Sequence, residues 1–250
     1  MSEHREMELL KQWLRESRHT AFLGGAGVST ASGIPDFRSA YGLYREKQQG
    51  ISYEEMLSHG FLVHHTAEFY DFMRRVMLYP DAKPNPAHFA LAKLEQEGKL
   101  DAVITQNIDG LHQMAGSKNV IELHGNENRY FCVSCGKTYN MSVVLESEGV
   151  PKCSCGGTIR PDVVLYGEPL DQRNMELAVK YVEQAELLLV GGTSLVVYPA
   201  AGLVNYLSRG AKLVLLNRDE TPYDDRADLV FRQDLSEVLR EASNLQSAGR

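Results

Sequence analysis

The chain contains 250 residues, of which 43% are hydrophobic and 24% charged, and its net charge at pH 7 is −7. This length predicts one α/β domain with a small additional module, and the negative charge excludes an overall basic field that would attract nucleic acid or an anionic membrane. The N-terminus lacks the apolar core of a signal peptide and no apolar run is long enough to span a membrane, so we expect a cytoplasmic protein without membrane or direct nucleic-acid partners.

Short apolar runs predict buried strands at residues 20–23, 102–105, 120–123, 187–190 and 213–216. Helical patterns lie between many of them. Asn85 offers a cap ahead of Pro86. Pro199 opens a helix that we expect to end at Gly210, and Asp234 caps the last helix. This alternation predicts a doubly wound parallel sheet whose ligand lies beyond the carboxyl ends of the strands.

Two stretches interrupt the alternation. Residues 39–84 are helical and loop-rich, with many aromatic side chains, and residues 129–157 contain all four cysteines. We expect these two insertions to form a smaller second domain together. The segments 1–38, 85–128 and 158–250 then form the large domain.

A glycine-rich loop, GGAGVSTASGIPDFR, follows the first predicted strand. Its glycines would let backbone N–H groups approach a phosphate at the start of a helix, whose dipole favours an anion. Thr30 stands where G-x-G-x-x-G has its third glycine, and no second strand ends in an acidic residue for a dehydrogenase ribose. The loop therefore disfavours a hydride-transferring dehydrogenase, and a strand-to-helix turn without a ligand remains an alternative.

Polar residues follow three later strands. After the strand at 102–105 come two amides and a carboxylate, from Gln106, Asn107 and Asp109. Such groups need hydrogen-bond partners if they are buried, and a bound nucleotide would supply them. An Asx-rich turn without a ligand is an equal alternative. His124 stands where the ligand crevice is expected, and its imidazole could accept a proton near pH 7. A structural role is equally open for it. The small and hydroxyl residues at 191–195 suit either a ribose or a plain turn.

The cysteines form two close pairs, Cys132 with Cys135 and Cys153 with Cys155. Four thiolates in two pairs suit a tetrahedral zinc ion, and their confinement to one segment favours a metal over disulfides. We expect a structural zinc, held in a ribbon whose two short strands lie between the pairs. A redox dithiol is the competing interpretation, and the second pair is shorter than the usual C-x-x-C.

The order of the motifs resembles the sirtuin family of NAD-dependent protein deacylases. GAGVSTASGIPDFR, TQNIDGLH, ELHG, CVSC with CSC, RPDVVLYGE, GGTSLVVYPA and LLNR occur in that family's order and spacing. The resemblance covers residues 20–235. It implies a Rossmann-like NAD-binding sheet with a small inserted domain of zinc ribbon and helices, with both substrates bound in the cleft between them.

The resemblance also assigns site residues. For consumed NAD it implies Gly25, Ala26, Gly27, Thr30, Asp36, Phe37, Arg38, Gln106, Asn107, Ile108, Asp109, His124, Gly192, Thr193, Ser194, Asn217, Arg218, Asp234 and Leu235. Phe37, Ile108 and Asp109 would surround nicotinamide. An acetyl-lysine protein or peptide would bind as an added β-strand against Val163, Tyr166, Gly167, Glu168, Val196, Val197 and Tyr198.

The implied reaction is removal of acetyl groups from lysine, releasing nicotinamide and O-acetyl-ADP-ribose. His124 would be the general base that deprotonates the ribose diol, and Asn107 would position a ribose hydroxyl or water. Family members that prefer succinyl- or malonyl-lysine have a Tyr and an Arg three residues later; here these positions are Tyr70 and Met73. Acidic acyl groups are therefore expected to be poor substrates. Mono-ADP-ribosylation and a non-catalytic NAD-binding or zinc-ribbon interaction module remain alternatives.

Overall fold

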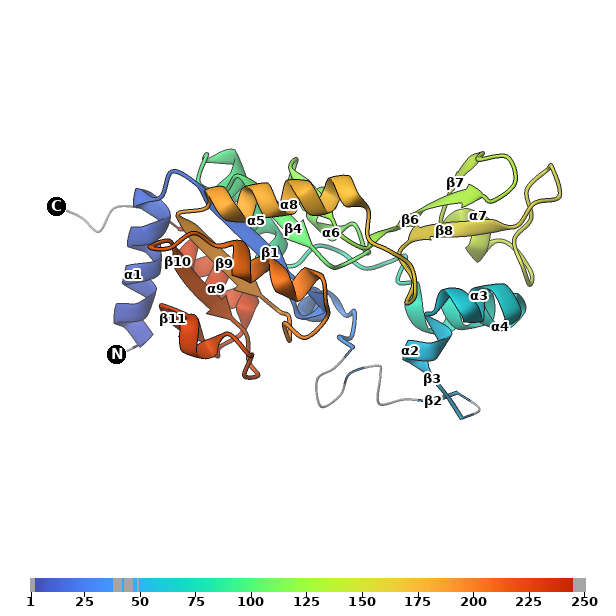
Figure 1. Cartoon of the computed structure of the whole chain (residues 1–250), viewed down its shortest axis with the longest axis horizontal. Helices are drawn as coiled ribbons and strands as arrows, with labels where there is room; N and C mark the ends of the chain where they lie inside the picture. Colours follow the sequence, from blue (N-terminus) through green and yellow to red (C-terminus); the bar gives the residue numbers. More distant parts are fainter. Residues whose placement is uncertain (1–2, 38–41, 43–46, 49, 245–250) are drawn as a thin grey trace.

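The computed structural model describes residues 3–37, 42, 47–48 and 50–244. It has a large and a small lobe (Figure 1). The large lobe is built on a six-stranded sheet in the order β11-β10-β9-β1-β4-β5, and every neighbouring pair in it is parallel. Its strands are β1 (Thr20–Gly24), β4 (Ala102–Thr105), β5 (Val120–Glu122), β9 (Leu187–Gly191), β10 (Lys212–Leu216) and β11 (Leu229–Phe231).

The apolar runs of the sequence form the centre of this sheet, as predicted. Successive side chains of a strand point to opposite faces. On β1, Phe22 therefore packs into one core, and Ala21 and Leu23 pack into the other. The chain adds β4 and β5 on one side of β1, and β9, β10 and β11 on the other. A crevice between the ends of β1 and β9 follows from this reversal of strand order.

Helices cover both faces of the sheet, as predicted for a doubly wound fold. Residues of α1 (Glu3–Glu16), α5 (Pro86–Gln96) and α9 (Leu235–Ala242) share one core with Phe22. Residues of α8 (Gln172–Gln184) and of the 3₁₀ helix η5 (Ala200–Tyr206) share the other. The predicted caps are confirmed, because the Asn85 side chain accepts from the Ala87 N–H and the Asp234 side chain accepts from the Ser236 N–H. Short helices α6 (Leu111–Ala115) and η6 (Asp224–Arg226) occupy connections.

Two local predictions are wrong. The helix expected from Pro199 to Gly210 is the shorter η5, which ends because the backbone of Leu207 is extended. The glycine-rich loop does not open an α-helix; it forms two 3₁₀ turns, η1 (Ala26–Val28) and η2 (Thr30–Ser32), and the second ends at Gly33 in the left-handed region. Turns of three residues lack the aligned peptide dipoles of a long helix, so the dipole argument for anion binding does not hold here.

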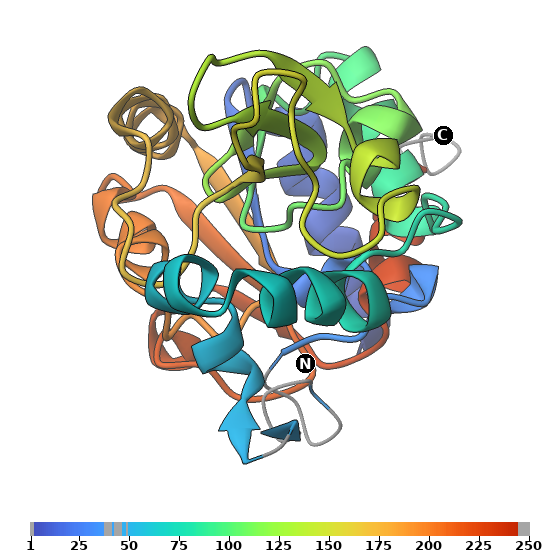
Figure 2. The ribbon, with the colours of Figure 1, turned by 90° about the vertical axis from the view of Figure 1, so that its right-hand side faces the viewer.

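The small lobe combines a helical segment with an antiparallel sheet. The first contains β2 (Lys47–Gln48), β3 (Ile51–Ser52), α2 (Tyr53–Met56), α3 (His59–His64), α4 (Thr66–Phe72) and a π-helical turn η4 (Met73–Met77). The sheet has the order β7-β6-β8, from β6 (Gly125–Cys132), β7 (Thr138–Asn140) and β8 (Ile159–Val163). Buried Phe69 and Tyr70 of α4 share a core with Tyr130 and Ile159 of this sheet. Figure 2 views this lobe end-on, with α3 and α4 crossing in front of the large lobe.

The zinc-ribbon prediction needs a correction of detail. Between the cysteine pairs lie one strand, β7, and a short helix, α7 (Ser142–Leu145), and the strands that pair around them are β6 and β8. The division at residues 129 and 157 stays a proposal, and the pairing of the small sheet extends beyond both numbers. Within the described ranges, no helix is both long and apolar enough to cross a membrane.

Candidate active site

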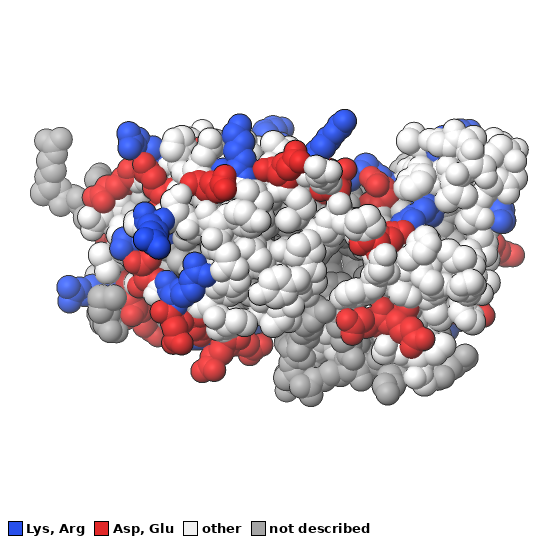
Figure 3. All heavy atoms as spheres, viewed as in Figure 1, with Lys and Arg blue, Asp and Glu red and all other residues white. Residues whose placement is uncertain are grey.

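A cavity of about 970 Å³ lies beyond the carboxyl ends of the parallel strands. It is lined by the loops that follow β1, β4, β5, β9 and β10, and by residues of the small lobe. In Figure 3 the large-lobe side of the junction between the lobes is mostly uncharged, and acidic side chains stand on the small-lobe side. Of the residues that the resemblance assigned, Arg38 lies outside the described residues, and Val196 is exposed and does not line the cavity. The remaining assigned NAD and peptide residues line it.

The glycine-rich loop packs directly against the loop after β9. A Cβ atom on Gly25 would lie 2.8 Å from the carbonyl oxygen of Gly192, and one on Gly27 would lie 2.7 Å from the Gly192 Cα. The N–H groups of Gly25 and Gly27 already donate to the carbonyl groups of Gly191 and Gly192. These two glycines therefore close the junction between strands β1 and β9. Contact of this loop with a phosphate stays a proposal for Ala26 and Thr30.

The polar residues after β4 are held by one hydroxyl group that sequence reasoning missed. Ser29 donates to the Asp109 carboxylate at 2.6 Å and accepts from the Asn107 side-chain amide at 3.0 Å. Asp109 also accepts from the Leu111 N–H at 2.9 Å, and burial raises the pKa of its carboxyl group. The place of Ser29 in the glycine-rich loop was its only signal in the sequence. Asn107 and Asp109 therefore have hydrogen-bond partners within the protein and also line the cavity.

Replacing Ser29 with alanine should therefore impair the site. Loss of a hydrogen bond to a buried charged group typically costs about 1–3 kcal/mol, so we expect the function of this site, measured as kcat/KM, to fall roughly tenfold or more. Steady-state kinetics of Ser29→Ala will measure this, with Ser208→Ala as the control because Ser208 is exposed and its hydroxyl donates to the Glu183 carbonyl, away from the cavity. Unchanged kcat/KM in Ser29→Ala would show that Asp109 and Asn107 need no such support.

His124 is oriented by the backbone. Its Nδ1 lies 2.8 Å from the carbonyl oxygen of Gln106, which can only accept, so Nδ1 carries the proton. Nε2 is then the basic nitrogen, and none of the described residues donates a hydrogen bond to it. Burial lowers the pKa of the imidazole, against the opposing effect of the Gln106 bond. The ring is therefore neutral at pH 7 and able to accept a proton within the cavity.

The adenosine end, as assigned by the resemblance, is also partnered within the chain. The Arg218 guanidinium lies 2.6 Å from the Asp234 carboxylate, which is at the same time the cap of α9. The Asn217 side chain donates to the carbonyl of Asp219. On the other side of the cavity, the Gln106 amide lies 3.2 Å from the Thr193 hydroxyl and so links the loops after β4 and β9.

The segments assigned to the peptide are not strands in this structure. Tyr166 uses its backbone N–H and C=O in bonds with Leu57 and His59, and so joins this loop to the helical segment. The Glu168 carboxylate accepts from Arg160 at 2.7 and 3.0 Å and from the Leu165 N–H at 2.9 Å. Burial would raise the pKa of Glu168, but these bonds lower it to about 2. Glu168 therefore holds the loop in place, and its side chain is not free for a peptide.

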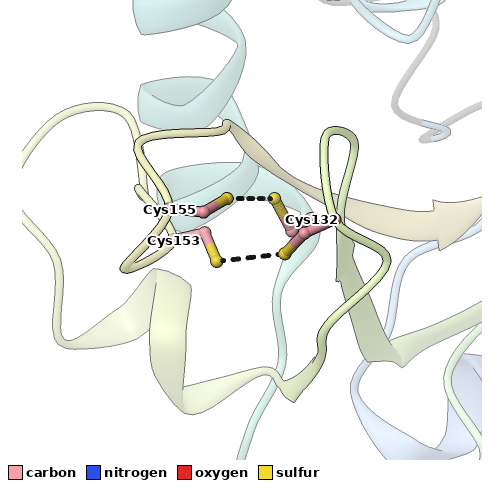
Figure 4. A group of neighbouring side chains, drawn as sticks. Cys132, Cys153 and Cys155 are labelled. Atoms are coloured by element: carbon pink, nitrogen blue, oxygen red, sulfur yellow. Dashed lines mark hydrogen bonds between the residues drawn. The ribbon is translucent and has the colours of Figure 1, made fainter.

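The four cysteines converge at the end of the small lobe (Figure 4). Their sulfur atoms all lie within 4.8 Å of one another; Cys132 and Cys155 are 3.5 Å apart, and Cys135 and Cys153 are 3.6 Å apart. Four thiolates about 2.3 Å from one tetrahedral zinc ion would be separated by about 3.8 Å. The residues thus fit the metal that the sequence predicted. With four protein ligands it keeps no open position and is structural.

Two neighbouring residues support this cluster. The Tyr139 hydroxyl donates to the Cys153 sulfur at 3.0 Å. A Cβ atom on Gly157 would lie 2.6 Å from the Cys132 sulfur, so only glycine fits there without a shift. Hydrogen bonds to ligand atoms orient them for the metal.

The chain is similar to known proteins over most of its length. A profile of the Sir2 family matches residues 25–199. An NAD-dependent protein deacetylase of Clostridium perfringens is 54% identical over 92% of this chain and 95% of its own length, and one of Clostridium tetani is 55% identical over 92% and 94%. The similar solved structures include a Sir2 variant with deacetylated p53 peptide and 3′-O-acetyl ADP ribose, with a TM-score of 0.87 at 47% identity, covering 94% of this chain and 96% of the other. A Sir2 complex with p53 peptide and NAD⁺ has a TM-score of 0.84, also at 47% identity, covering 94% and 95%.

Proposed function

Because the chain belongs to the Sir2 family, we propose that it is an NAD-dependent protein deacetylase, which releases nicotinamide and O-acetyl-ADP-ribose. The relatives that match nearly its whole length carry that activity in their names. The observation in this chain that carries the proposal is His124, a neutral imidazole whose basic nitrogen is left available at the cavity by the Nδ1 bond to Gln106. A site that only bound a dinucleotide would need no base there.

The proposed roles of the chain's own residues follow from their contacts. His124 accepts the proton of a ribose hydroxyl at Nε2, and Gln106 fixes both its tautomer and its ring orientation. Asn107, held by Ser29, positions the ribose hydroxyl or a water molecule. Asp109 accepts from the carboxamide of nicotinamide, and enclosing that group orients the bond to be cleaved. The other assigned residues that line the cavity hold the rest of NAD, which is a consumed substrate.

For the peptide, we propose binding as an added strand between residues 166–168 and 196–198. Solved Sir2 structures with acetylated or propionylated peptide support this class of substrate. Because the Tyr166 backbone is occupied, the pairing falls to Gly167 on one side and Val197 and Tyr198 on the other. Tyr198 is 68% exposed, so it serves as the outer contact for the peptide. Val163 lines the cavity and serves as a wall of the acyl-lysine tunnel.

The proposal is tested by mass spectrometry of an acetyl-lysine peptide incubated with this protein and NAD⁺. We expect deacetylated peptide, nicotinamide and O-acetyl-ADP-ribose in equal amounts. ADP-ribosylated protein without deacetylated peptide would instead establish the mono-ADP-ribosyltransferase alternative. NADH formation would establish a dehydrogenase, and an unchanged mixture would establish a binding module.

Acyl preference can be predicted from α4 and η4. Tyr70 is fully buried and donates its hydroxyl to the Ile159 carbonyl, and Met73 is buried. The Arg74 guanidinium bonds to Val144, Ser147 and Gly149 in the zinc-bearing segment. The Tyr70 hydroxyl and the Arg74 guanidinium are therefore not free to bind an acyl carboxylate. We expect kcat/KM for acetyl-peptide to exceed that for succinyl-peptide at least tenfold. Matched peptides that differ only in the acyl group test this, and a preference for succinyl-lysine would contradict it.

We also propose that the protein acts in the cytoplasm. All four cysteines are gathered in one metal-binding cluster. Thiols kept available for a metal suit a reducing compartment. Fractionation of the source cells with antibody detection would test this, and enrichment outside the cytoplasmic fraction would contradict it.

A further inference from the structure

A second acidic side chain lines the cavity next to Asp109, and the reaction as described gives it no role. Glu127 is only 4% exposed and lines the cavity. It lies in β6 where the register with β8 shifts between Asn126 and Tyr130, an irregularity of the kind that redirects side chains beside active sites. Its backbone N–H donates to the Ile108 carbonyl at 2.8 Å, which holds Glu127 against the loop assigned to nicotinamide.

Among the described residues, the carboxyl group of Glu127 has no hydrogen-bond partner. No side chain or N–H among the described residues donates a hydrogen bond to it. Glu127 lines the cavity, so its carboxyl group can meet a ligand there; a polar group that is largely buried is costly to leave unpaired. A carboxyl group that lines a ligand cavity without a protein partner points to a partner in the ligand.

The chemistry of the neighbouring residues defines which ligand group fits. Nicotinamide presents an NH₂ group, which donates, and a carbonyl oxygen, which accepts. Asp109 is proposed to take the NH₂ group, and the carbonyl oxygen, which has two lone pairs, can accept a hydrogen bond from a neighbouring donor. Burial first, and then the charge of Asp109, raise the pKa of Glu127 to about 8, so at pH 7 it is mainly a neutral carboxyl group with an O–H to donate.

We propose that Glu127 is a specificity-determining residue for nicotinamide, whose carboxyl group donates a hydrogen bond to the carbonyl oxygen of the carboxamide. This rests on the proposed function, because it takes the loop of Ile108 and Asp109 to face nicotinamide. The consequence is that capture of released nicotinamide, and hence product inhibition, depends on the protonation of Glu127.

The direction of that dependence follows from the groups around Glu127. As pH rises through about 8, Glu127 loses its O–H and gains a negative charge beside Asp109, so nicotinamide should bind less tightly. Burial raises the pKa values of Tyr79 and Tyr130, which stay neutral. His124 has a lowered pKa and is also neutral throughout. Burial raises the pKa of Asp109 as well, and the hydrogen bonds that its carboxylate accepts from Ser29 and the Leu111 N–H oppose that shift.

The test measures nicotinamide binding by calorimetry in the presence of ADP-ribose, at pH 7.0 and 9.5. It uses the wild type, Glu127→Leu and Glu127→Gln. Leucine removes the donor and packs as an apolar side chain in a buried place, so it does not threaten the fold. Glutamine keeps a donor at every pH. Glu183→Leu, at an exposed position of α8, is the matched control.

At pH 7.0 we expect Glu127→Leu to weaken nicotinamide binding roughly 3- to 10-fold, the typical worth of one hydrogen bond. Glu127→Gln and Glu183→Leu should bind like the wild type. Between pH 7.0 and 9.5 the wild type should weaken by a similar factor, while both Glu127 variants stay flat. Wild-type affinity in Glu127→Leu at pH 7.0, or the same pH dependence in it as in the wild type, would overturn the proposal.

The same proteins are assayed for deacetylation with nicotinamide as inhibitor, and the inhibition constants should follow the binding constants. Because calorimetry needs no turnover, the two proposals can fail separately. A wild type that binds nicotinamide with the expected pH dependence but forms no O-acetyl-ADP-ribose would contradict the proposed function alone. A wild type that deacetylates but shows no effect of Glu127→Leu on nicotinamide would contradict only the role of Glu127.

Discussion

Replacing His124 with alanine is expected to lower the rate of deacetylation by about a hundred- to ten-thousand-fold, the usual contribution of a general base. The imidazole is the neutral base of the cavity, and its Nδ1 is already committed to the Gln106 carbonyl. Alanine removes Nε2 without disturbing a core cluster. Folding should therefore be intact, with a thermal midpoint close to that of the wild type. Product formation in a peptide assay with saturating NAD⁺ measures the effect.

The control for this substitution is His64→Ala, because His64 is exposed at the end of α3. It should deacetylate at the wild-type rate. A second check is the pH profile of the wild type. Burial lowers the pKa of His124, so the imidazole stays unprotonated down to below the ordinary value of about 6.5. The acid limb of kcat should accordingly lie below pH 6.5, and near-normal turnover by His124→Ala would refute the role.

Loss of the zinc ion is expected to unfold the small lobe. Cys132 and Cys153 belong to the same buried cluster as Tyr130 and Ile159, so the metal joins the end of β6 to the loop before β8. Metal binding by such sites is coupled to folding and contributes several kcal/mol. For a protein of this size that corresponds to a fall of roughly 10 °C or more in Tm. Activity should be lost together with the fold, because this lobe supplies one wall of the cavity.

Two preparations test this prediction, the wild type treated with a chelator and Cys153→Ala. Metal analysis should give one zinc per wild-type chain and none in either preparation, and calorimetry should show the lower Tm. Lys152→Ala is the matched control, because Lys152 is exposed beside Cys153 and bonds only to Thr158. If Cys153→Ala kept a full equivalent of zinc and the wild-type Tm, the cysteine cluster would not be the metal site.

Much of this protein could be predicted from local patterns. Apolar runs identify the central strands, because a strand buried on both faces must be apolar throughout. The cap at Asn85 and the cysteine spacing are equally local, since each needs only residues close in the chain. The order of the motifs then indicated the family and placed His124 at the cavity. Strand β11 was missed, and η5 was overestimated because helical periodicity does not reveal where the backbone becomes extended.

The contacts that tune the site were decided by tertiary structure alone. Ser29 and Asp109 are 80 residues apart in the chain, and they meet because the sheet places the loops after β1 and β4 side by side. Glu127 faces the cavity because β6 and β8 shift register, which cannot be read from the alternation of one strand. Local sequence determines which segments become strands, turns and caps, because those depend on neighbouring residues. Only packing of distant segments determines which polar groups are buried together, and it is burial that sets their partners and their pKa values.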